Sequence, residues 1–121
     1  MKKKILVSRL YPKEGIRLLE KENFHLTLWE EKRPMTQVEL IEKAKSHHAL
    51  LCTLTEKIDS HFLTQCSHLE IISQFAVGYD NIDIDAATGF GIPVGFTPDA
   101  MSEATADIAF GLMIAVARKM F

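Results

Sequence analysis

The sequence predicts an α/β fold in which helices cover both faces of a parallel sheet of five strands. Five short apolar runs alternate with stretches in which apolar residues recur at helical spacing. Such alternation is typical of parallel sheets with right-handed crossovers. The 121 residues, of which 47% are hydrophobic and 25% charged, are enough for one domain with a core.

Five runs carry the strand signal. They span residues 4–8, 24–29, 49–53, 69–74 and 91–96. The second run alternates apolar and polar side chains, which is typical of an edge strand with one solvated face. The fourth is more continuously apolar and indicates a buried strand.

Two helices are predicted between the first three strands. Pro12 suits the first turn of a helix that ends near Asn23. We expect its inward face to consist of Ile16, Leu18 and Leu19. Thr36 and Glu39 match a capping box, in which each side chain bonds the other residue's backbone N–H. The apolar face of that helix is expected at Val38, Leu40, Ile41 and Ala44.

Three further helices follow, each with two candidate residues at its start. Asp59 or Ser60 caps the first, Asp83 or Asp85 caps the second, and Ser102 or Glu103 opens the last. Phe62 and Leu63 give the first of these helices its apolar face. Gly89 is well placed to stop the second. The last is expected to run to the end of the chain.

The stretch from Phe75 to Asp83 joins the fourth strand to the next helix. Gly78 lies where the chain must turn sharply, and glycine readily adopts positive φ. Such a loop presents backbone N–H groups, which suit an anionic group such as a carboxylate. An ordinary βα turn explains the same residues, and the local chemistry alone favours it.

Ligands of parallel sheets bind outside the carboxyl ends of the strands, near the switch in strand order. We expect the loops at residues 9–10, 53–55 and 76–80 to lie along that edge. Spacing alone yields no complete catalytic set. Gly89-Phe-Gly91 lacks the third glycine of a dinucleotide fingerprint and does not follow a strand, so it is rejected as one.

Charge and composition exclude several partners. A net charge of −2 gives no electrostatic case for nucleic acid or an acidic membrane. No run reaches the ~18 apolar residues of a membrane span, and Ile5–Val7 is too short for the core of a signal peptide. Cys52 and Cys66 fit no metal spacing, and we expect partly buried, reduced thiols in a cytoplasmic protein.

Histidine placement argues against a metal site. The five histidines are His25, His47, His48, His61 and His68. None has the i, i+4 spacing with a nearby acid that metal-binding helices use. We expect them at the surface or at helix ends.

Three blocks carry a family resemblance: Leu69–Asp83 (LEIISQFAVGYDNID), Ala86–Val94 (AATGFGIPV) and Thr97–Ala109 (TPDAMSEATADIA). Their sequence and order resemble the N-terminal half of the D-isomer-specific 2-hydroxyacid dehydrogenases. The third block and the stretch Ala49–Thr55 (ALLCTLT) are most similar to the glyoxylate and hydroxypyruvate reductase branch. With the start at Ile5–Leu10, the resemblance covers essentially all 121 residues.

The resemblance implies a flavodoxin-like, three-layer substrate domain. Backbone N–H groups of the loop Ala76-Val77-Gly78 would bind the carboxylate of a small 2-oxo or 2-hydroxy acid, and Leu54 would line the pocket. Thr105 would approach the nicotinamide of NAD or NADP. The implied activity is the reduction of an acid such as glyoxylate or hydroxypyruvate.

The sequence departs from the family pattern after its last helix. It ends at Phe121 without the Gly-rich phosphate loop and without the family's catalytic Arg, acid and His. We therefore expect residues 1–121 to be a partial substrate domain, from a truncated gene or an excised domain, with residues 103–121 leading into an NAD(P)-binding domain. We expect no catalytic residue here and no tight cofactor binding. The alternative is a non-catalytic interaction module, and the coding sequence beyond Phe121 would separate the two.

The last helix also suggests a partner. Residues 108–117 contain no charged or polar side chain, and a helix that is apolar all round is typical of full burial. It is too short to span a bilayer. We expect a homodimer through residues 103–121, or exchange of this helix between two chains. The alternative is that the helix frays and the chain stays monomeric or aggregates.

Overall fold

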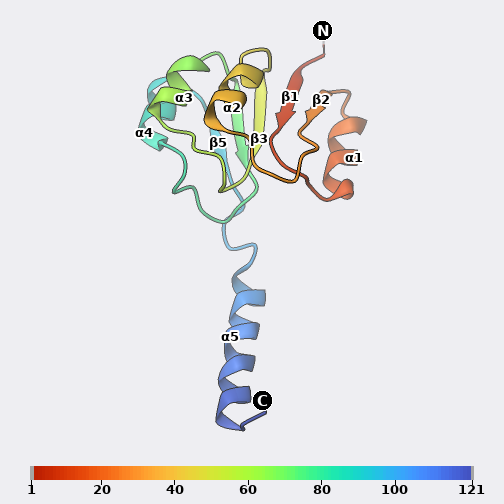
Figure 1. Ribbon diagram of the computed structural model, residues 1–121, viewed down its shortest axis with the longest axis vertical. Coiled ribbons are helices and arrows are strands. Elements are labelled where there is room, and N and C mark those ends of the chain that lie inside the picture. Colours follow the sequence, from red (N-terminus) through yellow and green to blue (C-terminus); the bar gives the residue numbers. More distant parts are fainter. Residues whose placement is uncertain (1, 121) are drawn as a thin grey trace.

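A computed structural model describes residues 2–120 and contains one five-stranded sheet, ordered β2-β1-β3-β4-β5, in which every pair is parallel (Figure 1). The elements are β1 (Lys4–Val7), α1 (Lys13–Lys21), β2 (His25–Leu28), α2 (Gln37–Ala44), β3 (Ala49–Cys52), α3 (Ser60–Gln65), β4 (Ile71–Gln74), α4 (Ile84–Gly89), β5 (Val94–Gly95) and α5 (Ser102–Ala117). The predicted flavodoxin-like α/β class is confirmed, with β2 at an edge as expected.

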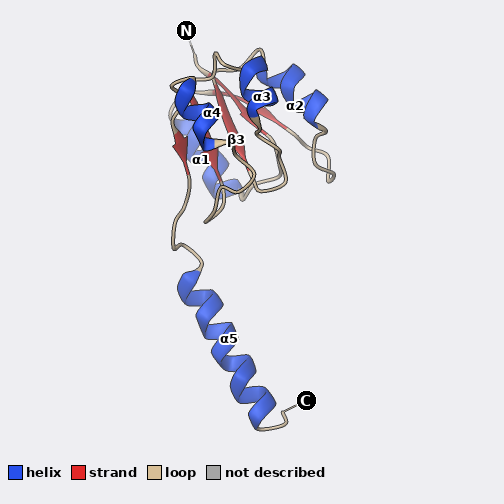
Figure 2. Ribbon diagram, turned by 90° about the vertical axis from the view of Figure 1, so that its left-hand side faces the viewer, coloured by secondary structure: helices blue, strands red, loops and turns tan. Residues whose placement is uncertain are grey.

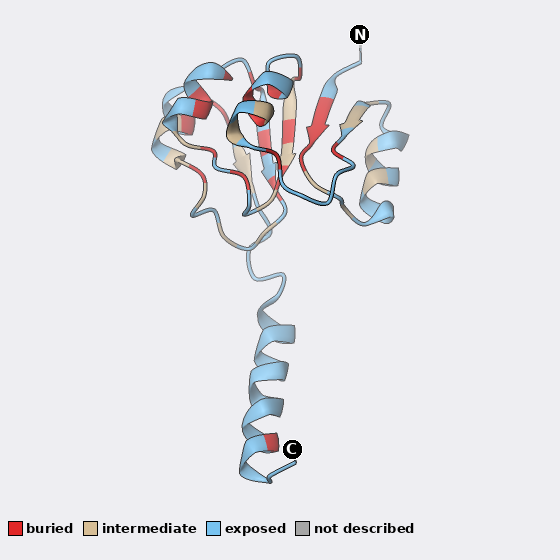
Figure 3. Cartoon of the chain, in the orientation of Figure 1, coloured by how far each residue is buried: buried red, intermediate tan, exposed pale blue. Residues whose placement is uncertain are grey.

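The hydrophobic core lies between the sheet and the layer formed by α2, α3 and α4 (Figures 2 and 3). Its largest fully buried apolar side chains are Leu6, Leu40, Leu50, Ile58, Phe62, Leu63 and Ile72. Strand residues alternate between the faces of a sheet, so Leu50 and Ile72 point into this core while Leu51 and Ser73 point to the other side.

The opposite face is only partly covered, which corrects the expectation of helices over both faces. On that side α1 packs beside β2 and buries none of its own residues fully. Leu18, expected to face inward, is 64% exposed. A groove of about 620 Å³ separates α1 from the outward sides of β3 and β4. The residues that line it include Leu18, Leu51, Ser73, Phe75 and Thr97.

Side-chain capping follows the predicted chemistry in α2, α3 and α4, whereas the N-cap of α5 is Met101, which makes no side-chain cap hydrogen bond. The box between Thr36 and Glu39 is complete, and Asp59 and Asp83 cap α3 and α4. Gly89, however, is still part of α4. The chain leaves that helix at Gly91, whose φ is +70°, where the N–H of Ile92 donates to the carbonyl of Ala87 at 2.9 Å.

Helix α5 projects from the carboxyl edge of the sheet and packs on neither face (Figures 1 and 2). It ends at Ala117 rather than at the chain end, and Arg118 is its C-cap. Phe121 lies outside the described residues. The exposed apolar side chains of α5 are Ile108, Phe110, Leu112, Met113, Ile114 and Val116. None of the helices in residues 2–120 is long and apolar enough to cross a membrane.

Candidate functional site

Two loops meet at the carboxyl edge of the sheet, as predicted: the β3 loop (residues 53–59) and the β4 loop (residues 75–83). Their backbones bond to each other at two points. The N–H of Ile58 donates to the carbonyl of Asn81, and the N–H of Asp83 donates to the carbonyl of Ile58, both at 2.9 Å. The loops therefore form one surface, although the residues that bond across them are more than twenty positions apart in sequence.

The β4 loop uses its carbonyl groups within the protein and leaves N–H groups free. The oxygen of Ala76 accepts from Thr97, and the oxygen of Gly78 accepts from Gln74 Nε2 at 3.1 Å. Within residues 2–120, the N–H groups of Ala76, Val77 and Gly78 donate to no backbone or side-chain acceptor. Unpaired N–H groups on successive residues favour an anion.

Gly78 does not have the conformation that the sequence suggested. Its φ is not positive; among the described residues positive φ occurs at Asn23, Gly91, Asp99 and Lys119. A Cβ placed on Gly78 would meet nothing within 4 Å. The absence of a side chain therefore leaves open space over the free N–H groups instead of relieving backbone strain.

Of the other predicted site residues, two lie on these loops and one lies on α5. Leu54 is 56% exposed on the β3 loop, and Val77 is 46% exposed on the β4 loop. Both belong to the same edge of the sheet. Thr105 lies on α5, exposed to solvent, and its side chain forms no hydrogen bond in the described part of the chain.

Two buried polar residues beneath these loops escaped the sequence-based prediction. Glu56 is 2% exposed, and its carboxylate accepts hydrogen bonds from the N–H of Thr53 at 2.7 Å and from the hydroxyls of Thr53 and Thr55. Gln74 is 1% exposed at the end of β4. The sequence contained a signal for Gln74, because it is a polar residue at an inward-facing strand position. Buried polar groups of this kind are normally fully hydrogen-bonded.

No activated nucleophile lies under the loops. Burial raises the pKa of the Cys52 thiol, and the charge of Glu56 raises it further. Burial likewise raises the pKa of the Tyr11 phenol, and electrostatic interactions with Cys52 and Glu56 raise it further. Both cysteines are free, and they are fully buried where we expected partial burial. These groups stay protonated near neutral pH and do not provide a nucleophile.

The histidines do not contribute to this edge. His47, expected at the surface or at a helix end, lies buried just after the end of α2, where Nε2 lies 2.7 Å from the Thr27 hydroxyl and Nδ1 lies 2.7 Å from the Lys43 carbonyl. These contacts satisfy both ring nitrogens and give His47 a structural role. No cluster of three or more His, Cys, Asp or Glu side chains suited to a metal occurs in residues 2–120.

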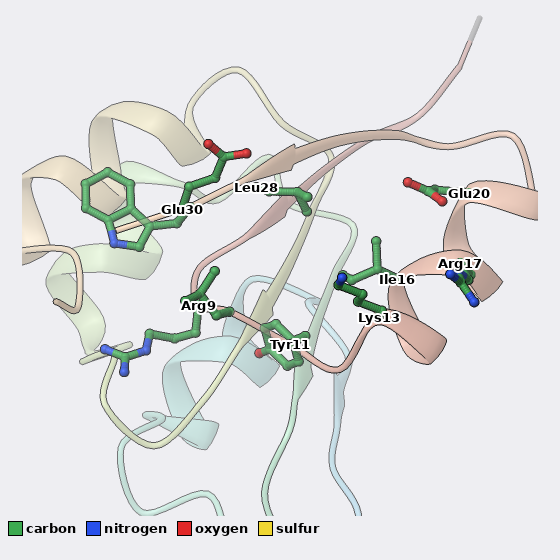
Figure 4. Close-up of a pocket in the computed structure, with 10 residues that line it drawn as sticks. Arg9, Tyr11, Lys13, Ile16, Arg17, Glu20, Leu28 and Glu30 are labelled. Carbon is green, nitrogen blue, oxygen red and sulfur yellow. The ribbon is translucent and has the colours of Figure 1, made fainter. Parts of the chain in front are cut away.

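A separate pocket of about 360 Å³ lies between α1 and the ends of β1 and β2 (Figure 4). Its charged lining is mixed in sign. The charged side chains are Arg9, Lys13, Arg17, Glu20 and Glu30. It contains neither Leu54 nor the segment 76–78. We assign no function to it.

The fold and this edge define an α/β domain of the doubly wound class whose loops face outward from the carboxyl ends of the strands. The catalytic-domain model of the D-isomer specific 2-hydroxyacid dehydrogenases matches residues 5–118, and the chain belongs to that family.

Individual relatives agree with this assignment. The chain is 45% identical to a glyoxylate reductase of Pyrococcus furiosus, over 98% of this chain and 35% of that protein. The TT0316 protein of Thermus thermophilus matches with a TM-score of 0.86 and 29% identity, over 97% of this chain and 37% of the other. An NAD+-bound 3-phosphoglycerate dehydrogenase of Entamoeba histolytica matches with a TM-score of 0.78 and 25% identity, over 95% and 39%. The chain thus spans little more than a third of the proteins it matches.

Proposed function

We propose that this chain is the substrate-binding domain of an NAD(P)-dependent D-2-hydroxyacid dehydrogenase similar to glyoxylate and hydroxypyruvate reductases. The carboxylate of a 2-oxo acid binds the free N–H groups of Ala76, Val77 and Gly78, and Leu54 lines the same pocket. The observation that carries the proposal is the set of three unpaired N–H groups beside the open space at Gly78. The Pyrococcus furiosus relative, by its name a glyoxylate reductase, supports the choice of substrate.

The residues of this chain do not by themselves fit the cofactor's phosphates. Gly89 and Gly91 end α4 instead of starting a helix, so they offer no N-terminal phosphate cradle. The contribution that we assign to the described residues is the binding and orientation of the acid. We keep Thr105 as a contact to the nicotinamide, on the helix that leads away from this domain.

Glyoxylate titration of the ¹⁵N-labelled chain tests the proposal. We expect amide shifts at residues 53–55 and 76–80 with an affinity no better than about millimolar, because the loops are open to water. Gly78→Ala fills the open space and should remove these shifts. Gly15→Ala is the matched control, because a Cβ at Gly15 also meets nothing within 4 Å. Shifts scattered over other residues, or equal effects of both variants, would contradict the site.

A second candidate is a non-catalytic interaction module. It is favoured by α5, whose apolar side chains face solvent on all sides, and by the groove beside α1. In this alternative the chain forms a homodimer or docks a protein partner, and acid binding is absent. The free, buried cysteines support a reducing, cytoplasmic location in either case.

A further inference from the structure

We propose that Asn81 is a positioning residue that locks the β3 loop to the β4 loop and thereby holds the free N–H groups in place. The inference deepens the proposed function, on which it rests. It concerns a side chain that touches none of the three free N–H groups, and it assigns to that side chain a role in the geometry of the carboxylate site.

The amide of Asn81 bridges the two loops directly. Its Nδ2 donates to the main-chain carbonyl of Glu56 at 2.7 Å and to that of Thr53 at 3.1 Å. Both acceptors lie in the β3 loop, 25 and 28 residues away in sequence. Beyond the ends of β3 and β4, the Asn81 side chain thus replaces the backbone hydrogen bonds that join neighbouring strands within the sheet.

Gln74 anchors Asn81 to the core. Its amide exchanges hydrogen bonds with that of Asn81, donating to Oδ1 and accepting from Nδ2 at 3.3 Å. The same Nε2 also donates to the carbonyl of Gly78. Because Gln74 is buried at the end of β4, the pair transmits the rigidity of the sheet to both loops. Fully satisfied buried networks of this kind fix one conformation.

Hydrogen bonds to two carbonyls of the β4 loop also set the direction of the N–H groups that follow them. In a planar trans peptide, the C=O and the following N–H point in opposite directions. The carbonyl of Gly78 is held by Gln74, so the N–H of Tyr79 points away from the core. The carbonyl of Ala76 is held by Thr97, so the N–H of Val77 is oriented in the same way. Gln74, from the core, and Thr97, from the segment after β5, thus orient the N–H groups of Tyr79 and Val77.

Hydrogen bonds within the β3 loop stabilise its conformation independently of Asn81. The carboxylate of Glu56 is satisfied by Thr53 and Thr55 of the same loop. This turn keeps the carbonyls of Thr53 and Glu56 directed at Asn81. Removal of the Asn81 donors should free the two loops from each other while the Thr53–Glu56 turn persists.

Asn81→Asp is the sharpest variant, because it keeps the shape and replaces two N–H donors by an oxygen that faces carbonyl oxygens. Asn81→Ser is the milder variant and retains one donor. Gln65→Glu is the matched control, because Gln65 is exposed on α3 and has no side-chain hydrogen bond among the described residues. Each variant is examined by amide hydrogen exchange without ligand and by glyoxylate titration.

In Asn81→Asp we expect the amides of Ile58 and Asp83, which bond across the loops, to exchange at least about tenfold faster, the effect of losing one to two hydrogen bonds. Glyoxylate should bind about tenfold more weakly by the same reasoning. The exchange rates and glyoxylate affinity of Asn81→Ser should fall between those of Asn81→Asp and wild type, and those of Gln65→Glu should match wild type.

Unchanged exchange at Ile58 would overturn the inference, since the β3 loop would then not depend on Asn81. Faster exchange in both loops with unchanged glyoxylate affinity would also overturn it, because Asn81 would then serve folding alone. A wild-type chain that shows no glyoxylate shifts would refute the proposed function instead, while the exchange rates would still decide whether Asn81 couples the loops.

Discussion

Thr97 donates two hydrogen bonds to the carbonyl oxygen of Ala76, one from its N–H at 2.9 Å and one from its hydroxyl at 3.0 Å. The segment after β5 is thereby fixed to the β4 loop. Nearby, the rings of Tyr79 and Phe96 meet edge to face, with centroids 5.0 Å apart. The free N–H groups are thus supported from the β5 side as well as from the β3 side.

Thr97→Val should weaken this support, because it keeps the shape and the N–H bond but removes the hydroxyl. We expect a loss of about 1 kcal/mol in the free energy of unfolding, the usual value of one hydrogen bond. Urea denaturation measures it. Thr88→Val is the control, because the exposed Thr88 side chain makes no hydrogen bond in the described residues. Equal losses in the two variants would show that the Thr97 hydroxyl is unimportant.

His47 should make the fold less stable in mild acid. Burial, assisted by the positive charges of Lys4, His25 and His48, lowers the pKa of His47 from its ordinary value of 6.5. As the pH falls through 6.5, the unfolded chain binds a proton that folded His47 does not yet bind. The free energy of unfolding should therefore decrease below that pH and be constant above it.

The comparison of His47→Gln with His61→Gln isolates this effect. His61 is exposed, so its replacement should leave the acid sensitivity unchanged. The sensitivity should shrink in His47→Gln, and urea denaturation at about pH 7.5 and about pH 5.5 measures it where carboxylates stay ionised. A wild-type chain equally stable at both values would contradict the prediction.

We predict that α5 makes the chain self-associate. Met113 is 68% exposed, and an apolar surface of this kind rarely remains uncovered on a monomer. Sedimentation equilibrium at micromolar concentration should show a dimer. Met113→Glu or Ile114→Glu should dissociate it by placing an unpaired charge in a dry interface. Val38→Glu, at an equally exposed apolar residue on α2, should not. A monodisperse wild-type monomer would refute the prediction.

The 121-residue chain assayed alone should not oxidise NADH or NADPH in the presence of glyoxylate. It contains no Gly-rich phosphate loop to orient a cofactor, and lost orientation accounts for on the order of 7–11 kcal/mol of barrier. Lost acid–base catalysis costs a further ~10²–10⁴-fold. A turnover above ~1 s⁻¹, in the normal enzyme range, would contradict this expectation.

The sequence was sufficient for the fold because local signals and the alternation of elements agreed. The capping box at Thr36 and the cap at Asp59 could be recognised from side-chain chemistry alone. Burial was harder to predict. Leu18 and Val38 have apolar side chains at helical spacing, yet both face solvent, because the neighbouring layer does not extend over them. Periodicity identifies a helix face but does not show what lies opposite.

The site was predicted less completely. The resemblance located Leu54 and the segment 76–78, and the structure places both on one edge. The reason given for Gly78 was wrong, because its φ is not positive. Asn81 lies in the loop predicted between Phe75 and Asp83, but its bonds to Thr53 and Glu56 depend on two loops meeting in space. Sequence spacing carries no information about such contacts.

The parallel sheet also constrains the order of events during folding. Strand β1 pairs with β2 on one side and with β3 on the other, so that Ile5 lies opposite Leu26 and Ala49. Each parallel pair needs an intervening crossover, and no neighbouring strands can close as a hairpin. The chain must therefore lose much of its conformational entropy before these distant pairings compensate for it, so we expect it to fold more slowly than a helical bundle of similar length.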